Sequence, residues 1–289
     1  MVKGVRSGRP SALQRSLHIF RRRWQLHAFM LIPLMLCIIF AYVPMFCLQI
    51  AFKNYTIRAC VFGSPWAGFR HFETFLNSFH FWRSLRNTIV ISLYSLCVGF
   101  PIPIIFALLM SEVRCNRYKR VVRTVSYMPH FISLVVMCGM IVLFLSPSSG
   151  VIPKLLGYIG VQTGDLMGKA SAFSSIYVWT EAWQHVGWDS IMYIAALSAV
   201  DPQLYEAAVV DGANKWQKMR SIDIPLLMPT AVVLFILRAG SVMSVGFENV
   251  YLMQNSVNLA YSEIISTYVY KVGMQDSDFS YSTAIGLFH

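Results

Sequence analysis

The chain has 289 residues, of which 56% are hydrophobic and only 13% are charged, and its formal net charge is +11. About a quarter of the residues in soluble domains are charged, so this composition argues against a soluble protein and indicates an integral membrane protein. The basic excess does not indicate a nucleic-acid partner, because the Lys and Arg residues cluster beside apolar runs.

The first 26 residues form a basic tail without an acidic residue, and the cluster Arg21–Arg23 directly precedes the first apolar run. Basic segments beside membrane spans are typical of the cytoplasmic side. We therefore expect a cytoplasmic N-terminal tail over residues 1–26 and a membrane domain over residues 27–289.

Apolar runs long enough to cross a membrane recur along the chain. A helix needs about 20 apolar residues to cross a ~30 Å hydrocarbon core. We expect transmembrane helices over residues 29–50, 88–110, 125–146, 172–200 and 230–253, and the start of a sixth over 281–289. The sixth run is too short to cross, so we expect this chain to end inside its last span.

The distribution of basic residues predicts the topology. Residues 114–123 follow the second run and are rich in Lys and Arg, which places them in the cytoplasm. Alternation then places residues 53–85, 147–171 and 254–280 outside and 201–228 inside. Residues 53–85 are rich in aromatic side chains, which suit a segment along the outer membrane interface, with contact to sugar rings as the alternative.

No catalytic site or metal site is predicted. The six cysteines have no paired short spacing, so metal or redox chemistry is not indicated. The chain has no Gly-rich phosphate loop followed by Lys and Ser or Thr, so we expect it to hold no cofactor and to bind no ATP itself.

The inner segment 201–225 has clear helix boundaries. Asp201 is suited to cap a helix that starts at Pro202 and runs to about Val210. Gly212 suits the left-handed backbone that ends a helix. A second short helix is expected over residues 213–220.

The first of these helices has the features of a docking surface. Ala207 and Ala208 are small, so another protein can approach the backbone closely, and Glu206 adds a charge beside them. This pattern favours a contact with another protein rather than an active site.

The segment resembles the permease subunits of binding-protein-dependent ABC importers, in the branch that handles sugars, oligosaccharides and polysaccharides. The family signature is Glu-Ala-Ala, three residues, Gly, nine residues, Ile, one residue, Leu and Pro, and Ile224 replaces its leucine here. Six positions at about 7% usage each match by chance in on the order of 10⁻⁷ of windows. The matching residues are Glu206, Ala207, Ala208, Gly212, Ile222 and Pro225.

This resemblance implies an all-α polytopic permease of the bacterial inner membrane, with residues 201–225 as the cytoplasmic loop that couples it to an ATPase. It also implies the partners: a cytoplasmic ABC ATPase dimer that binds ATP and Mg, a second permease subunit that is a related but different chain, and an extracytoplasmic solute-binding protein. The sequence of residues 246–253 resembles that of permeases in the polysaccharide branch.

Polar residues in the fourth run are candidates for a substrate pathway. Glu181, His185 and Asp189 share one helical face, and Trp188 lies close by. Together with Trp183, they line either a substrate pathway or a polar contact with a partner subunit. Charged groups inside a membrane are costly, so we expect this face to meet protein or water.

Two other classes of protein remain as alternatives, and three further polar residues have expected positions. A gradient-driven transporter or channel coupled through Glu181 and Asp189 is the main alternative, and a membrane-embedded enzyme is a distant third. Arg238 and Glu248 would lie about 15 Å apart on one helix and not pair. His130 is expected at the start of a helix.

Overall fold

The computed structural model describes residues 23–147, 150–160 and 165–288. Within these ranges the chain is helical and has no β-strand, apart from an isolated bridge between Lys53 and Trp66, which confirms the all-α expectation. Most of the basic tail lies outside the described residues. The chain divides into two compact units, one that ends at Phe69 and one over Arg70–His289.

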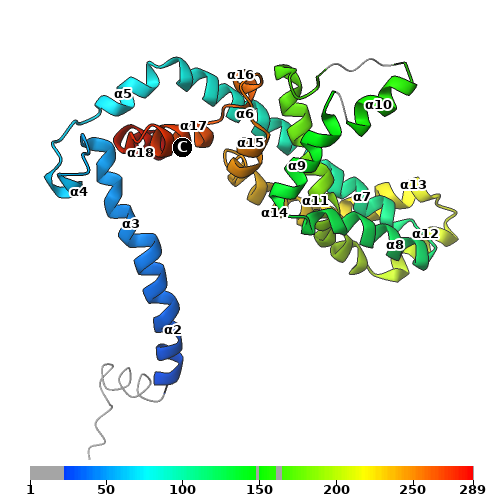
Figure 1. Cartoon of the computed structure of the whole chain (residues 1–289). Coiled ribbons are helices and arrows are strands. Elements are labelled where there is room, and N and C mark those ends of the chain that lie inside the picture. The colour runs from blue at the N-terminus through cyan, green and yellow to red at the C-terminus, as the bar shows by residue number, and fades with distance from the viewer. Residues whose placement is uncertain (1–22, 148–149, 161–164, 289) are drawn as a thin grey trace, which may run out of the picture. The chain divides into compact units, whose positions relative to one another are not determined.

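The first unit contains one long helix, Trp24–Phe52 (Figure 1). It is built from α2 (Trp24–Cys37), a π-helical turn (Ile38–Tyr42), α3 (Val43–Met45) and a 3-10 turn (Phe46–Phe52). The wider π turn accommodates Pro44, which has no amide hydrogen to donate in an α-helix. The expected span over 29–50 is confirmed, and α2 has no buried residue within this chain.

A small folded loop follows this helix. The Lys53 ammonium is buried, donates a 2.8 Å hydrogen bond to the Val61 carbonyl and stands over the Trp66 ring. Residues between them include the short helix α4 (Cys60–Gly63). These contacts make residues 53–66 a compact turn.

The second unit begins with α5 (Arg70–Leu76), α6 (Phe79–Gly99) and α7 (Pro101–Ser111). The Ser78 hydroxyl accepts a hydrogen bond from the Phe81 amide and starts α6 earlier than the expected residue 88. Residues 79–85, expected in an outer segment, are therefore the first turns of a helix that continues over 33 residues to Ser111.

The third expected span is broken. α8 (Asn116–Tyr127) and a 3-10 turn (Met128–Phe131) are bent by 101° from α9 (Leu134–Leu145). The expectation of one helix over 125–146 is wrong, because Ile132 and Ser133 leave the helical backbone conformation. His130 lies in the 3-10 turn rather than at a helix start. A short helix, α10 (Val151–Tyr158), follows.

The 26-residue helix α11 (Phe173–Ser198) lies at the centre of the second unit and packs against α6, α7, α8 and α14. Gly187 lets the backbone of α8 approach α11 closely. A Cβ atom there would lie 2.2 Å from the Ser126 carbonyl oxygen on α8. Tyr193 and Leu197 lie in a buried cluster with Ala107 and Leu227. The expected span over 172–200 is confirmed as a helix.

The fifth expected span is displaced along the chain. α13 (Lys215–Lys218), a π turn (Met219–Asp223) and α14 (Ile224–Gly240) form one helix that ends at Gly240. The Ser241 hydroxyl donates to the Arg238 carbonyl at this end and competes with further helix hydrogen bonds. The expectation over 230–253 is therefore wrong, and α15 (Phe247–Met253) is a separate helix.

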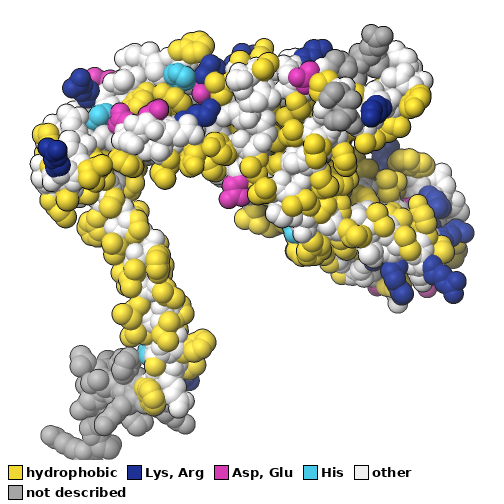
Figure 2. Space-filling view, in the orientation of Figure 1, with side chains coloured by type: hydrophobic (Ala, Val, Ile, Leu, Met, Phe, Trp, Pro, Cys, Tyr) yellow, Lys and Arg dark blue, Asp and Glu magenta, His cyan; other side chains and the backbone are white. Residues whose placement is uncertain are grey.

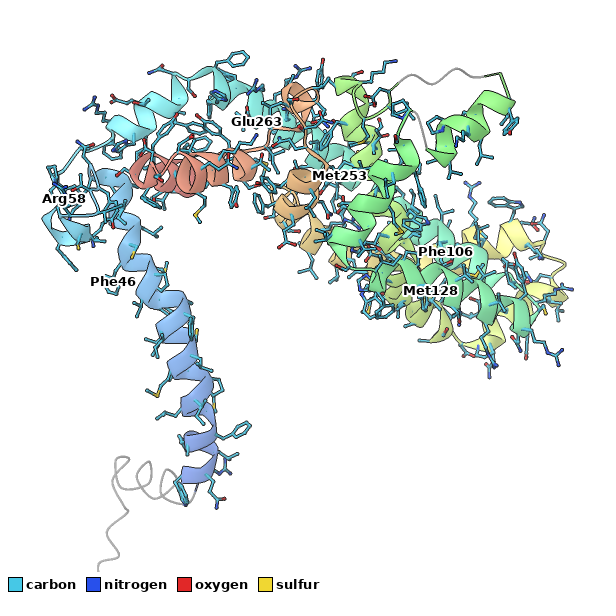
Figure 3. The ribbon with its side chains drawn as sticks, viewed as in Figure 1. Phe46, Arg58, Phe106, Met128, Met253 and Glu263 are labelled. Carbon is cyan, nitrogen blue, oxygen red and sulfur yellow. The ribbon has the colours of Figure 1, made fainter. Side chains whose placement is uncertain are left out.

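The last part of the chain packs on α5 and α6 through α16 (Leu259–Ser262), α17 (Ile265–Tyr270), a π turn (Lys271–Gln275) and α18 (Phe279–Phe288). The buried Glu263, labelled in Figure 3, lies 3.1 Å from His80 Nδ1, accepts a hydrogen bond from Arg83 Nε and forms an ion pair with the Arg83 guanidinium. Phe75 and Phe81, expected at the membrane interface, lie in an aromatic cluster with Tyr268.

Three helices of the described ranges are long and apolar enough to cross a membrane, and the bent pair α8–α9 is a fourth if it counts as one span. These helices are Trp24–Phe52, Phe79–Ser111 and Lys215–Gly240. α11 is long but carries the polar face of Glu181, His185 and Asp189, and it packs against α6, α7, α8 and α14. The chain is thus a polytopic, all-helical membrane protein.

Candidate functional site

The loop between α11 and α14 carries α12 (Pro202–Val210), and its helix boundaries are those expected. Asp201 Oδ1 accepts a 2.9 Å hydrogen bond from the Gln203 amide, and Pro202 occupies the first helical turn. Gly212 has a φ of +75°, in the left-handed region. The cap, the helix end and the glycine elbow are confirmed.

The second half of the loop differs from the expectation. Asn214 and Gln217 form a capping box, with reciprocal hydrogen bonds of 2.7 and 2.9 Å. The helix that starts there continues through the π turn into α14, so residues 213–220 are not a separate short helix. The π turn accommodates Pro225, whose ring would crowd the carbonyl four residues earlier in a regular α-helix.

A hydrogen bond ties α12 to this helix. The Tyr205 hydroxyl donates to Asp223 Oδ1 over 2.5 Å, and Asp223 is only 1% exposed. Burial, and then the neighbouring Asp223 carboxylate, raise the pKa of Tyr205 above its ordinary value. Asp223 is not among the residues predicted for this site, although an acid at the start of an apolar span is a signal that could indicate it.

The remaining surface of α12 is open. None of its residues is buried, and Glu206, Ala207 and the apolar Val209 and Val210 are exposed. A largely apolar helix that leaves most of its residues exposed is typical of a surface that another protein covers.

The six signature residues fall on three elements. Glu206, Ala207 and Ala208 lie on α12, and Gly212 forms the elbow. Ile222 lies in the π turn and Pro225 in the first turn of α14. The spacing of the signature therefore spans an exposed helix, a glycine elbow, a π turn and the start of the next span.

The polar face of α11 forms a second candidate site. Arg238 of α14 donates to Asp189 at 3.3 Å and to the Gly99 carbonyl at 3.0 Å. A Cβ atom on Gly99 would lie 2.5 Å from the Arg238 guanidinium, so glycine leaves room for it. Arg238 was expected to lie on one helix with Glu248, but Glu248 belongs to α15, and the sequence did not reveal the partner Asp189.

Glu181 and His185 lie on the same face. Glu181 Oε2 accepts a 3.1 Å hydrogen bond from the Ser95 hydroxyl, and His185 Nδ1 lies 3.1 Å from the Glu181 carbonyl oxygen. A cavity of about 110 Å³ lies beside Glu181 and Arg238. Its other polar lining residues are Ser92, Ser95, Tyr177, Ser241 and Ser244. Such a lining offers hydrogen bonds to hydroxyl groups.

The two tryptophans lie in different places. The Trp188 ring stacks on His130 with a 4.3 Å centroid separation and lines a cavity of about 420 Å³ with Asp189 and Arg238. Trp183 is half exposed and does not line the cavities beside Glu181. The structure thus brings four of the five candidate residues to neighbouring cavities and leaves Trp183 apart. Among the described residues, no three His, Cys, Asp or Glu side chains are grouped to hold a metal ion.

The family comparison decides the class of protein. Residues 99–288 match the family of binding-protein-dependent transport system inner membrane components. The chain belongs to this family. It is therefore a multi-pass inner-membrane permease component of an ABC transporter and not an enzyme, which argues against the gradient-driven alternative.

Similar proteins span nearly the whole permease. The chain is 40% identical to Protein LplB of Bacillus subtilis (strain 168) over 93% of this chain and 84% of LplB. It is 39% identical to the polygalacturonan/rhamnogalacturonan transport system permease protein YteP of the same organism, over 87% of this chain and 78% of YteP.

Solved structures show the same fold. A bacterial ABC transporter involved in the import of the acidic polysaccharide alginate aligns with a TM-score of 0.88 at 39% identity, over 95% of this permease and 92% of that chain. The alginate transporter in complex with an alginate pentasaccharide-bound periplasmic protein aligns with a TM-score of 0.86 at 39% identity.

Proposed function

We propose that this permease belongs to an ATP-driven importer that moves an oligosaccharide or polysaccharide delivered by an extracytoplasmic solute-binding protein. Its relatives include proteins named for alginate and polygalacturonan transport, and this supports a saccharide substrate. The hydroxyl-rich cavity beside Glu181 supports the same substrate class.

The coupling proposal rests on α12. Its exposed residues, including Glu206 and Ala207, dock on a separate cytoplasmic ABC ATPase dimer, which binds ATP and Mg. Closure of the ATPase dimer moves α12 as a lever. The hydrogen bond from Tyr205 to Asp223 carries this movement to the helix that contains α14.

The second permease subunit completes the pathway. Trp183 and Trp188 of α11 are half exposed within this chain. A related but different second chain would cover this face. In this arrangement the N-terminus and residues 201–225 lie on the cytoplasmic side.

Affinity purification from native membranes in mild detergent tests the docking site. We expect the wild type to recover an ATPase and a second permease, and Glu206→Lys to lose only the ATPase. Glu73→Lys is a matched control, because Glu73 is an exposed acid on α5. Equal recovery of the ATPase by all three proteins would contradict docking through α12.

Gly212→Asp tests the lever itself. A Cβ atom at Gly212 meets open space, and Asp tolerates the left-handed conformation better than most residues. Because Asp fits the elbow, we expect the variant to remain in the membrane, whereas its added negative charge beside α12 should disturb docking on the ATPase, so that ATPase activity is no longer coupled to uptake. Unchanged uptake would contradict the lever model.

A further inference from the structure

A basic cavity of about 430 Å³ lies between α12 and the ends of the long helices, in a size range typical of ligand sites. Its lining includes the end of α7, the end of α11 and the start of the helix at Lys215. Five cations and two acids line it: Arg114, Lys119, Arg123, Lys215 and Lys218, with Glu112 and Asp223. Figure 2 shows Lys and Arg side chains gathered over this end of the unit.

The acids do not neutralise this cluster. Glu112 lies 3.8 Å from Lys215, and Asp223 accepts the hydrogen bond from Tyr205. In the described part of the chain, no salt bridge forms at Arg114, Lys119, Arg123 or Lys218. The cavity therefore keeps an excess of positive charge.

One cationic group lacks a partner inside the fold. The Nε atom of Arg123 is buried and has no hydrogen-bond partner. A buried donor without a partner costs free energy, so a bound acceptor at this position would be favoured. Lys119 precedes Arg123 by one helical turn, and both side chains are partly buried.

The cavity lies at a boundary between polar and apolar surface. α8 turns by 101° from α9 and carries exposed apolar residues, including Tyr118, Val121 and Val125, beside its basic residues. An amphipathic basic helix of this kind is suited to the headgroup region of a membrane. Phosphate groups are the anions concentrated there.

We propose that this cavity binds a phosphate-bearing anion, supplied by a lipid headgroup or by a soluble phosphate compound, and that the anion bridges α8 to the coupling loop. Lys119 and Arg123 bind the anion from α8, and Lys215 and Lys218 bind it from the helix that follows α12. The placement of this cavity at the cytoplasmic leaflet rests on the proposed function, whereas the binding of the anion does not.

The test measures binding to the purified, delipidated full chain at constant ionic strength. Three probes are compared: phosphatidylglycerol, phosphatidylcholine and inorganic phosphate, with native mass spectrometry and the thermal unfolding midpoint as readouts. Lys119→Gln with Arg123→Gln is the cavity variant. Arg117→Gln with Arg120→Gln is the matched control, because both residues are exposed on α8 and do not line the cavity.

We expect phosphatidylglycerol or inorganic phosphate to bind the wild type and the control equally. The cavity variant should bind about tenfold more weakly, because charge-assisted hydrogen bonds are lost. Binding of phosphatidylglycerol alone identifies a lipid source, and a shift with inorganic phosphate identifies a soluble source. Lys218→Gln, in which α8 is unchanged, should also weaken binding.

Three results would overturn the proposal. These are no binding of phosphatidylglycerol or of inorganic phosphate, equal binding by the cavity variant and the wild type, or an equal loss of binding in the control variant. None of these readouts needs an ATPase or transport. Failure of the phosphate site is therefore distinguishable from failure of the proposed importer function.

Discussion

Arg238 on α14 lies 3.3 Å from Asp189 on α11, so one ion pair joins the two helices on either side of the loop that carries α12. Each side chain is 31% exposed. In a span, a charge that loses its partner is costly. This pair is therefore placed to hold α11 and α14 together.

Removal of either member of this pair should destabilise the permease. We expect Asp189→Asn or Arg238→Gln to cost about 1–3 kcal/mol, because a charged hydrogen bond is lost and its partner remains. The double variant should recover part of the loss. Thermal unfolding in detergent of the wild type, the two single variants and the double variant gives a double-mutant cycle. Strictly additive effects would show that the two side chains are not coupled.

Gly187→Ala should destabilise the contact between α8 and α11. The new Cβ would meet backbone atoms of Ser126, which cannot move without a shift of α8. Overpacking of this kind costs about 1–3 kcal/mol. Gly139→Ala in α9 is the control, since its Cβ meets no atom within 4 Å, and it should leave the unfolding midpoint unchanged or raise it.

Gly212→Val should weaken coupling through backbone strain. A β-branched residue at a φ of +75° is disfavoured, and a left-handed residue with a Cβ costs about 1–2 kcal/mol. Gly212→Asn should retain most of the uptake, because Asn tolerates this conformation. Equal uptake by the two variants would show that the elbow conformation does not matter for coupling.

Tyr205→Phe should loosen α12 in a pH-dependent way. The pKa of Tyr205 is raised by burial and by Asp223, so the hydroxyl remains protonated beyond its ordinary pKa of about 10. Stability from a raised pKa is fully present below the unfolded value and is lost as pH rises through the folded value. The difference in unfolding midpoint between wild type and variant should stay constant from about pH 7 to 9 and shrink above about 10.

The control for this titration is Tyr158→Phe, because Tyr158 is fully exposed on α10. We expect no difference from wild type in that variant at pH 7 to about 9. A difference between wild type and Tyr205→Phe that changes within this range would contradict the assignment to the Tyr205 hydroxyl.

Glu263→Gln should destabilise the attachment of residues 259–265 to α6. Glu263 is 2% exposed and accepts a hydrogen bond from Arg83 Nε, so its neutral substitute leaves a cation without its counter-charge. The loss of a buried partner costs about 3–5 kcal/mol. Glu73→Gln on the exposed face of α5 is the control and should change the unfolding midpoint little.

Local signals in the chain were strong enough to predict where α12 begins and ends. Asp201, Pro202 and Gly212 act through their own backbone chemistry, so the cap, the helix start and the elbow follow from residue type and order. The apolar runs likewise predicted helices because a membrane span depends on length and composition. Helix ends inside apolar sequence were harder to predict, because a break such as that at Ile132 does not change the local pattern of apolar residues.

The sequence by itself determined the class of protein, the helical content and the helix boundaries at Asp201, Pro202 and Gly212, because each depends on composition or on residues within a few turns of one another. Only the tertiary structure decided which polar groups meet. Asp189 and Arg238, and Glu181 and Ser95, are joined across different helices, and Glu263, between α16 and α17, is joined to Arg83 on α6. Such pairs depend on how the helices pack, and no local spacing encodes that distance.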